Sequence, residues 1–139
     1  MKMTTLIVAS VALLVVLSAA AGIAAQPSGV SEQQVAALAS AAAQEGLESQ
    51  AAILADGKVT VSEYGQAVRT TVSCLEAAGY DARADEVSGE AGFVITVLNP
   101  GDPQAVTAED AMAPMDAAYD TCDQQYKRLV ESVYRATGR

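Results

Sequence analysis

The sequence contains no His and no Trp, one Phe, and only two Cys. The absence of His removes the side chain most often used for acid–base catalysis near neutral pH. It also removes Ser-His and Cys-His nucleophile pairs and the commonest zinc ligand. An enzyme made from this chain would therefore have to use carboxylates, Lys or Tyr.

Cations are also few: eight Lys and Arg stand against 17 Asp and Glu, for a net charge of −9. Binding to nucleic acid requires clustered cations that displace counterions from phosphates, and here the cations are scattered. The composition therefore excludes nucleic acid as a partner, and it disfavours an anionic membrane surface for the same reason. An acidic balance of this kind is typical of a protein that must stay soluble outside the cell.

The length of 139 residues suits one domain. About half of the residues count as hydrophobic, but many of these are Ala, which buries little area. The core must then be small, and a small core gains much from a covalent cross-link.

The N-terminal segment has the parts of a secretory signal. Lys2 precedes an apolar run over residues 6–17, and small residues follow as far as Ala25. We expect cleavage after Ala24 or Ala25, with cleavage after Ala21 as an alternative. The alternative is an uncleaved anchor, because residues 6–25 provide the length of about 20 residues that crosses a bilayer.

These features predict three segments: a signal peptide or anchor over residues 1–25, a linker over 26–30, and one domain over 31–139. Cleavage would remove only Lys2 among the charged residues and leave a net charge of −10. The predicted location is extracytoplasmic, either secreted or in the cell envelope. Membrane contact is expected only if the first segment stays uncleaved.

Two capping-box patterns, in which Ser or Thr precedes Gln or Glu by three residues, mark helix starts in the domain. Ser31 and Gln34 form the first pattern, and Thr60 and Glu63 form the second. Each box satisfies backbone N–H groups that a helix start would otherwise leave unpaired. We therefore assign Thr60 and Glu63 as helix-capping residues.

Three helices follow from these starts. The first is expected over residues 32–45 and the second over 47–55, where Asp56-Gly57 stops it. The third runs from the second capping box to about residue 78, and Gly79 suits its left-handed C-terminal position. Its apolar stripe has spacings of four and three and consists of Tyr64, Val68, Thr71, Leu75 and Ala78.

The next segment changes to strand type. Residues 93–98, "FVITVL", are β-branched and aromatic, and residues 80–83 are their expected partner in a hairpin. Pro100-Gly101 suits a type II turn after the strand. The resulting fold class is α+β, mostly α, with disulfide-linked helices and a small β-hairpin.

A last helix is expected over residues 114–136, with Pro114 in its first turn. Its apolar stripe consists of Met115, Tyr119, Cys122, Tyr126, Leu129 and Val133. Another side carries an i,i+4 ladder of alternating charge, made of Asp123, Lys127, Glu131 and Arg135.

The two cysteines are predicted to form a disulfide, Cys74–Cys122, since an even count in an exported chain favours bonding. The alternative is a redox-active pair, but the Cys-x-x-Cys spacing that lowers a thiol pKa is absent. Closing a loop of about 48 residues would contribute roughly 4 kcal/mol through loop-closure entropy. The bond would also force the third and last helices to lie together.

Carboxylates are the remaining source of chemistry. Asp116, Asp120 and Asp123 fall on one side of the last helix, where they either bind a hard cation or form a solvated acidic surface. No second carboxylate is assigned to pair with Glu63 or Glu76. The tyrosines at 64, 119 and 126 are expected to pack in the core, with a binding platform as the alternative.

The stretch "ILADGKVTVSEY", residues 53–64, resembles the rear half of an EF-hand loop. With Gly57 at the sixth loop position, the calcium ligands would be Asp56, Thr60 and Glu63. The first and third positions are Ala52 and Leu54, which offer no side-chain oxygen. No metal is expected here, and a degenerate calcium site is the alternative.

A wider resemblance covers about residues 50–135. The segments "ILADGKVTVSEYGQAVRTTVSCLEAAGY" and "AAYDTCDQQYKRLVESVY" resemble a class of small exported proteins of high-GC Gram-positive bacteria. The resemblance implies an architecture and a location but no activity.

The sequence thus favours a non-catalytic extracytoplasmic module that binds an unknown protein or small molecule, without a cofactor. The alternatives are a degenerate EF-hand-like calcium-binding protein and a carboxylate-based enzyme.

Overall fold

The structure is a computed structural model that describes residues 29–87, 92–98 and 107–137. This part of the chain forms five helices and a two-stranded antiparallel sheet, so the fold is α+β and mostly α, as predicted. The elements in chain order are α1 (Glu32–Gln44), α2 (Glu48–Leu54), α3 (Val61–Ala77), β1 (Ala82–Glu86), β2 (Phe93–Val97), α4 (Ala108–Tyr126) and α5 (Arg128–Ala136).

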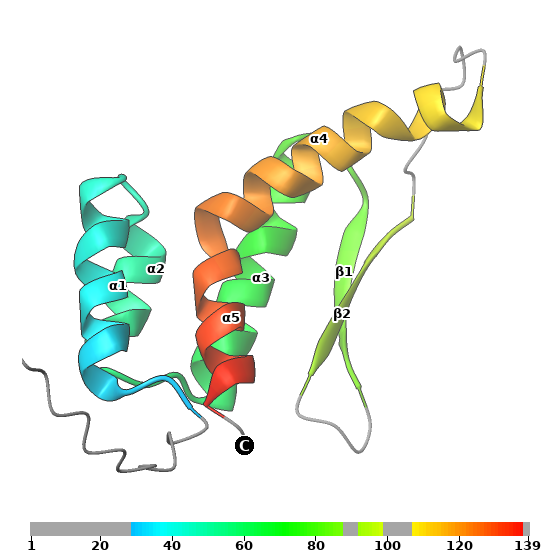
Figure 1. Cartoon of the computed structure of the whole chain (residues 1–139). Helices are drawn as coiled ribbons and strands as arrows, with labels where there is room; N and C mark the ends of the chain where they lie inside the picture. The colour runs from blue at the N-terminus through cyan, green and yellow to red at the C-terminus, as the bar shows by residue number, and fades with distance from the viewer. Residues whose placement is uncertain (1–28, 88–91, 99–106, 138–139) are drawn as a thin grey trace, which may run out of the picture.

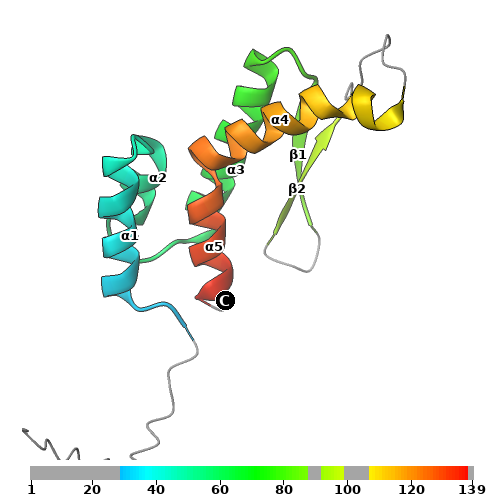
Figure 2. The ribbon, with the colours of Figure 1, turned by 45° about the horizontal axis from the view of Figure 1, so that its top comes forward.

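Helix α3 is the central element of the fold. It contacts α2, α4, α5 and both strands. Figure 1 shows the pair α1–α2 on one side of α3 and the hairpin on the other. Helix α5 runs along α3, whereas α4 turns away from α5 and crosses above the hairpin, as Figure 2 also shows.

The helix ends follow from local sequence. Both predicted capping boxes are present, at Ser31 and at Thr60. Gly79, two residues after the end of α3, terminates the helix. It has φ +96°, a conformation that favours glycine. The Gly79 N–H donates to the Glu76 carbonyl and the Tyr80 N–H to the Leu75 carbonyl, both at 3.0 Å, which is a Schellman motif.

The buried side chains form two clusters on either side of the middle of α3. The larger cluster joins α1, α2, α3 and α5 and centres on Tyr64. The Tyr64 ring stacks on the Tyr134 ring with the centroids 4.7 Å apart, and it packs edge to face with the Phe93 ring with the centroids 5.4 Å apart. The smaller cluster joins α3, α4 and the hairpin around Leu75, Ala82 and Cys122. Of the stripe predicted on α3, four members are buried and Ala78 is exposed, because Ala78 lies at the end of the helix.

The hairpin confirms the predicted strand at residue 93 onward and shifts its partner. Strand β1 covers 82–86, not 80–83, and pairs with β2 so that Ala84 lies opposite Ile95. Ile95 and its neighbours on the same face pack against the helices, whereas Val94 and Leu98 on the other face are each 52% exposed. The turn predicted at Pro100-Gly101 lies outside the described residues.

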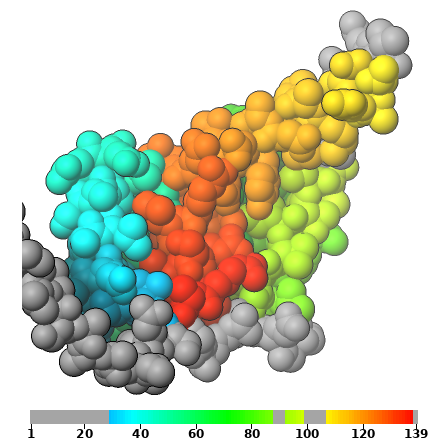
Figure 3. Space-filling model, in the orientation of Figure 1, coloured from blue at the N-terminus to red at the C-terminus, as the bar shows by residue number. Residues whose placement is uncertain are grey.

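The last helix begins earlier than predicted. Helix α4 starts at Ala108, where the Thr107 hydroxyl accepts the N–H of Asp110 at 3.0 Å, and Pro114 lies inside the helix and not in its first turn. Pro114 cannot donate a hydrogen bond to the Asp110 carbonyl. Both residues are exposed, so water can replace that bond. Figure 3 shows these first turns of α4, in yellow, projecting past the hairpin.

The predicted last helix is also divided. Lys127 has φ −128° and ψ −38°, outside helical values, and it separates α4 from α5. The break turns the two halves toward different clusters: Cys122 of α4 lies in the smaller one, and Val133 of α5 lies in the larger one.

Gln50 of α2 satisfies the backbone at this break. Its side chain is fully buried. The amide nitrogen donates to the Gln124 carbonyl at 2.6 Å, and the amide oxygen accepts the Leu129 N–H at 2.8 Å. These two partly buried backbone groups would otherwise lack these partners, and an unpaired buried group costs about 1–3 kcal/mol.

In the described part of the chain, no helix has the length and apolar character that crossing a membrane requires. The predicted signal peptide or anchor at 1–25 lies outside the described residues, as do residues 26–28 of the predicted linker. Val30, at the end of that linker, packs against the larger cluster.

Substitution of Gln50 tests whether its hydrogen bonds stabilise the break between α4 and α5. We expect Gln50→Leu to lower the free energy of unfolding by about 2–4 kcal/mol, because it leaves both backbone groups unpaired. Denaturant unfolding followed by circular dichroism measures the change. Gln44→Leu, at an exposed position of α1, is the control and should change stability by less than about 0.5 kcal/mol. Equal effects of the two substitutions would contradict the role of Gln50.

Candidate functional site

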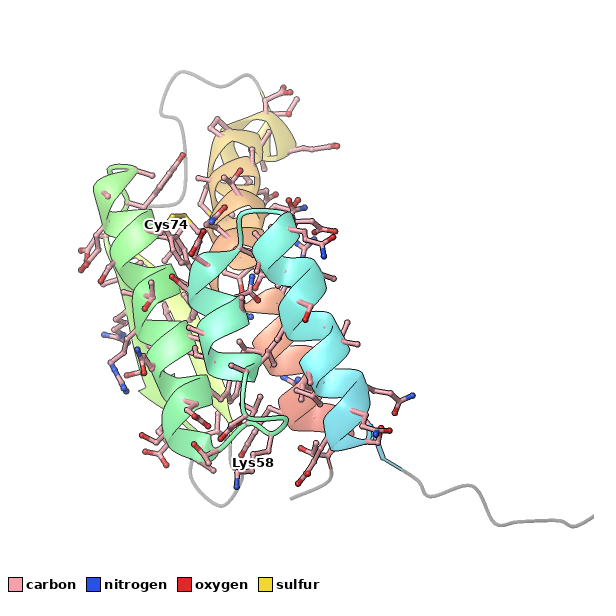
Figure 4. All side chains as sticks on the ribbon, turned by 90° about the vertical axis from the view of Figure 1, so that its left-hand side faces the viewer. Lys58 and Cys74 are labelled. Atoms are coloured by element: carbon pink, nitrogen blue, oxygen red, sulfur yellow. A yellow bond between two sulfur atoms is a disulfide. The ribbon has the colours of Figure 1, made fainter. Side chains whose placement is uncertain are left out.

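The predicted disulfide is confirmed: Cys74 of α3 and Cys122 of α4 are bonded, with their Cα atoms 5.8 Å apart. Cys122 is buried and Cys74 half-buried. The bond lies in the smaller cluster, next to Leu75 and Tyr119. It therefore fixes α4 against the C-terminal half of α3, near the end marked by Cys74 in Figure 4.

The predicted charge ladder exists, but part of it is buried. Lys127 is only 6% exposed and Asp123 only 8%. The Lys127 Nζ lies 2.7 Å from Asp123 Oδ1 and also contacts Glu131 Oε2, and Arg135 donates to Glu131 Oε1 at 2.6 Å. The ladder was expected on a helix side of its own. The break at Lys127 instead turns its middle members inward, toward Tyr64 of α3.

Burial and pairing set the protonation of this network. Burial disfavours the charge on Lys127, but hydrogen bonds to Asp123 and Glu131 outweigh it, so the pKa of Lys127 lies above its ordinary value. Burial likewise disfavours the charge on Glu131, and hydrogen bonds from Lys127 and Arg135 again outweigh it, so the pKa of Glu131 lies below its ordinary value. Burial, followed by the charge of Glu131, raises the pKa of Tyr64. At neutral pH Lys127 and Glu131 are therefore ionised and Tyr64 is neutral.

The three aspartates of α4 do not share one environment. Asp120 and Asp123 both pair with Arg128, and Asp123 also pairs with Lys127. Asp116 is exposed. Pairing with two cations leaves Asp123 little capacity to act as a ligand for a metal ion.

The EF-hand-like stretch forms the joint between α2 and α3, which Figure 4 marks with Lys58. The Glu63 Oε2 accepts the Thr60 N–H at 2.8 Å and the Thr60 hydroxyl at 2.7 Å. Asp56 accepts the Lys58 N–H at 3.2 Å. Two of the three candidate ligands thus bond to each other at the start of α3, and the third bonds to the turn.

The front of that stretch is helical. Ala52 and Leu54 lie in α2, where an EF-hand loop would be coiled. Within the described residues, no group of three or more His, Cys, Asp or Glu side chains is placed to hold a metal ion.

A groove of about 320 Å³ lies between α2 and α3. Its size is at the lower end of the range for small-molecule sites. Small side chains at Ala52 and Ala67 leave its floor unfilled. Successive turns of one face of each helix and the last residue of α4 line it: Ser49, Ala52, Ile53, Glu63, Gln66, Ala67, Thr70 and Tyr126.

The two ends of the groove differ in chemistry. Helices α2 and α3 are antiparallel, so Glu63 and Ile53 lie at the end near the joint (Figure 4). Ser49 and Thr70 lie at the far end. Tyr126 belongs to that end as well, because the nearby Gln124 carbonyl is held by Gln50, the neighbour of Ser49. The groove thus has a carboxylate at one end and hydroxyls with an aromatic ring at the other.

Several polar groups of the groove have no hydrogen-bond partner among the described residues. Within the described part of the chain, the side chains of Ser49, Gln66 and Tyr126 form no hydrogen bond, and neither does the Oε1 atom of Glu63. The Thr70 hydroxyl donates to the Gln66 carbonyl at 3.0 Å and keeps its lone pairs for a ligand. A hollow with an apolar floor and free polar groups is the usual form of a binding site.

A second hollow of about 240 Å³ lies between the end of α1 and the break. Its only cation is Arg128, which is already bonded to Asp120 and Asp123. Arg128 is therefore little available to an anion, and the carboxylate of Glu45 is the other charged group in the lining.

Four of the groove residues have other predicted roles. Glu63 is a predicted helix cap and the alternative calcium ligand, Tyr126 belongs to an apolar stripe with a binding platform as the alternative, and Ala52 and Ile53 belong to the EF-hand-like stretch. The sequence predicts no role for Ser49, Gln66 or Thr70. Their spacing of three to four residues along helices gives no signal of its own, because only the antiparallel pairing of α2 and α3 brings them together.

Comparison with protein-family models, with curated proteins and with solved structures finds no match to this chain.

The disulfide gives a prediction on stability. Replacing both cysteines by Ser opens a loop with a sequence separation of 48 residues, and we expect a loss of about 4 kcal/mol in the free energy of unfolding. Urea unfolding of the oxidised protein and of the double variant measures the difference. Two reactive thiols in the unfolded, unreduced protein would show that the bond is absent.

The buried network gives a prediction on pH. Since the pKa of Glu131 is lower in the folded state than its unfolded value of about 4.5, its stabilisation is complete above that pH and is lost as the pH falls through the folded pKa. Glu131→Gln should cost about 1–3 kcal/mol at pH 7 and flatten the loss of stability below pH 4.5. Urea unfolding at several pH values measures both effects.

Glu48→Gln, at an exposed position of α2, is the matched control for that series. It removes the same charge without touching the network. A stability profile of Glu131→Gln that coincides with the profile of Glu48→Gln would show that the network does not stabilise the fold.

Proposed function

We propose that this protein is a non-catalytic extracytoplasmic module that binds a small molecule in the groove between α2 and α3. The groove carries the proposal, because it combines an apolar floor with polar groups that the described chain leaves free. A polar group at the wall of a hollow that lacks an internal partner is available to a ligand at no cost in lost protein hydrogen bonds.

The rest of the molecule is consistent with a binding role outside the cytoplasm. A disulfide between two helices is the expected device of a small exported domain. The segment at 1–25 has the pattern of a secretory signal, and the chain resembles a class of small exported proteins. The groove holds a single carboxylate and no His, Lys, Arg or Cys, so the hydroxyls of Ser49 and Thr70 have no His or Lys in the lining to act as a base.

A screen by nuclear magnetic resonance tests the proposal. A library of small cationic, neutral and anionic compounds is added to the ¹⁵N-labelled protein, and shifts of the backbone amides are mapped. We expect at least one compound to move the amides of residues 49–53 and 63–70 together. Ala52→Phe should abolish these shifts, because its ring fills the groove from an exposed position of α2.

Ala37→Phe, at an exposed position of α1, is the control and should leave the shifts unchanged. If no compound moves the groove amides, or if Ala52→Phe and Ala37→Phe behave alike, the groove is not the binding site.

A further inference from the structure

The groove between α2 and α3 is charged at one end only. Glu63 is the single ionisable acid in its lining, and the lining contains no Lys or Arg. Glu63 is half-buried, and its Oε2 is occupied by the two bonds from Thr60. The other oxygen, Oε1, accepts no hydrogen bond from the described residues and remains for a ligand.

The distance between the ends suits an extended ligand. Glu63 and Thr70 are seven residues apart on α3, which corresponds to about 10 Å along the helix axis. Ala52 and Ala67 give the groove an apolar stretch between these two residues. A ligand that reaches both ends must therefore have an apolar middle.

We propose that the groove binds small primary ammonium compounds with an extended apolar chain, an inference that rests on the proposed binding function. The ammonium donates to Glu63 Oε1, the chain lies over Ala52, Ile53 and Ala67, and its far end reaches Tyr126. A compact ammonium beside a carboxylate forms a charge-assisted hydrogen bond, which is stronger than a neutral one. The acidic charge of the protein, −9 over the full chain, adds a general attraction for cations.

Other charged ligands fit the groove less well. A carboxylate or phosphate would meet Glu63 without a compensating cation in the lining. A metal ion would find one carboxylate where calcium requires six or more oxygen ligands. A quaternary ammonium group is recognised by aromatic rings, and the aromatic ring of the lining, Tyr126, lies at the far end from Glu63.

Three probes of equal chain length test the inference: hexylammonium, 1-hexanol and hexanoate. Their dissociation constants are measured at pH 7 from the shifts of the backbone amides of residues 49–53 and 63–70. We expect hexylammonium to bind roughly five-fold or more tightly than 1-hexanol, the ratio that corresponds to an ion pair at a hydrated surface. Hexanoate should bind more weakly than 1-hexanol.

Two matched variants separate Glu63 from the general charge. Glu63→Gln keeps a residue that can complete the capping box, so the start of α3 is preserved. Glu63→Gln should reduce the affinity for hexylammonium to the affinity for 1-hexanol, and it should leave the affinity for 1-hexanol unchanged. Glu76→Gln removes the same charge from an exposed position of α3 outside the groove and should leave the five-fold ratio intact.

Equal binding of hexylammonium and 1-hexanol by the unsubstituted protein overturns the inference, as does an equal loss of the ratio in both variants. In that case, binding of 1-hexanol that Ala52→Phe abolishes would leave the proposed binding function in place. If none of the three probes and no compound of the screen moves the groove amides, the inference and the proposed function both fail.

Discussion

The fold depends on the break at Lys127 and on the hydrogen bonds that make it possible. Because of this break, α4 crosses above the hairpin whereas α5 runs along α3. The break allows α4 to join the smaller cluster through Cys122 and α5 to join the larger one through Val133. Buried backbone groups must be paired, and Gln50 supplies both bonds from a helix 74 residues earlier in the chain.

Buried charges lie at the same break. There Lys127 pairs with Asp123 and Glu131. Burying one charge alone would be costly, whereas a chain of alternating charges gives each member a partner of opposite charge. The charge network and Gln50 thus both stabilise the corner between α4 and α5. The two hydrogen bonds of Gln50 also attach α2 to that corner.

The groove follows from the way α2 is held. Gln50 attaches the N-terminal half of α2 to the α4–α5 corner, and the turn with the Thr60–Glu63 box attaches its C-terminal end to α3. Between these two attachments, Ala52 and Ala67 are too small to close the space between the helices. Glu63, which completes the capping box at the start of α3, therefore also gives the groove its negative charge.

The sequence by itself determined the local features: two capping boxes, the helix end at Gly79, the strand at residue 93, and the mostly helical class. Each depends on a few adjacent residues, whose hydrogen bonds or dihedral preferences act before any tertiary contact forms. It also determined the disulfide, since only one pairing of two cysteines exists. Only the tertiary structure decided the break at Lys127, the inward turn of the charge ladder and the groove. These depend on contacts between residues far apart in the chain, such as Gln50 with Leu129, and no local pattern shows which distant side chain will satisfy a buried backbone group.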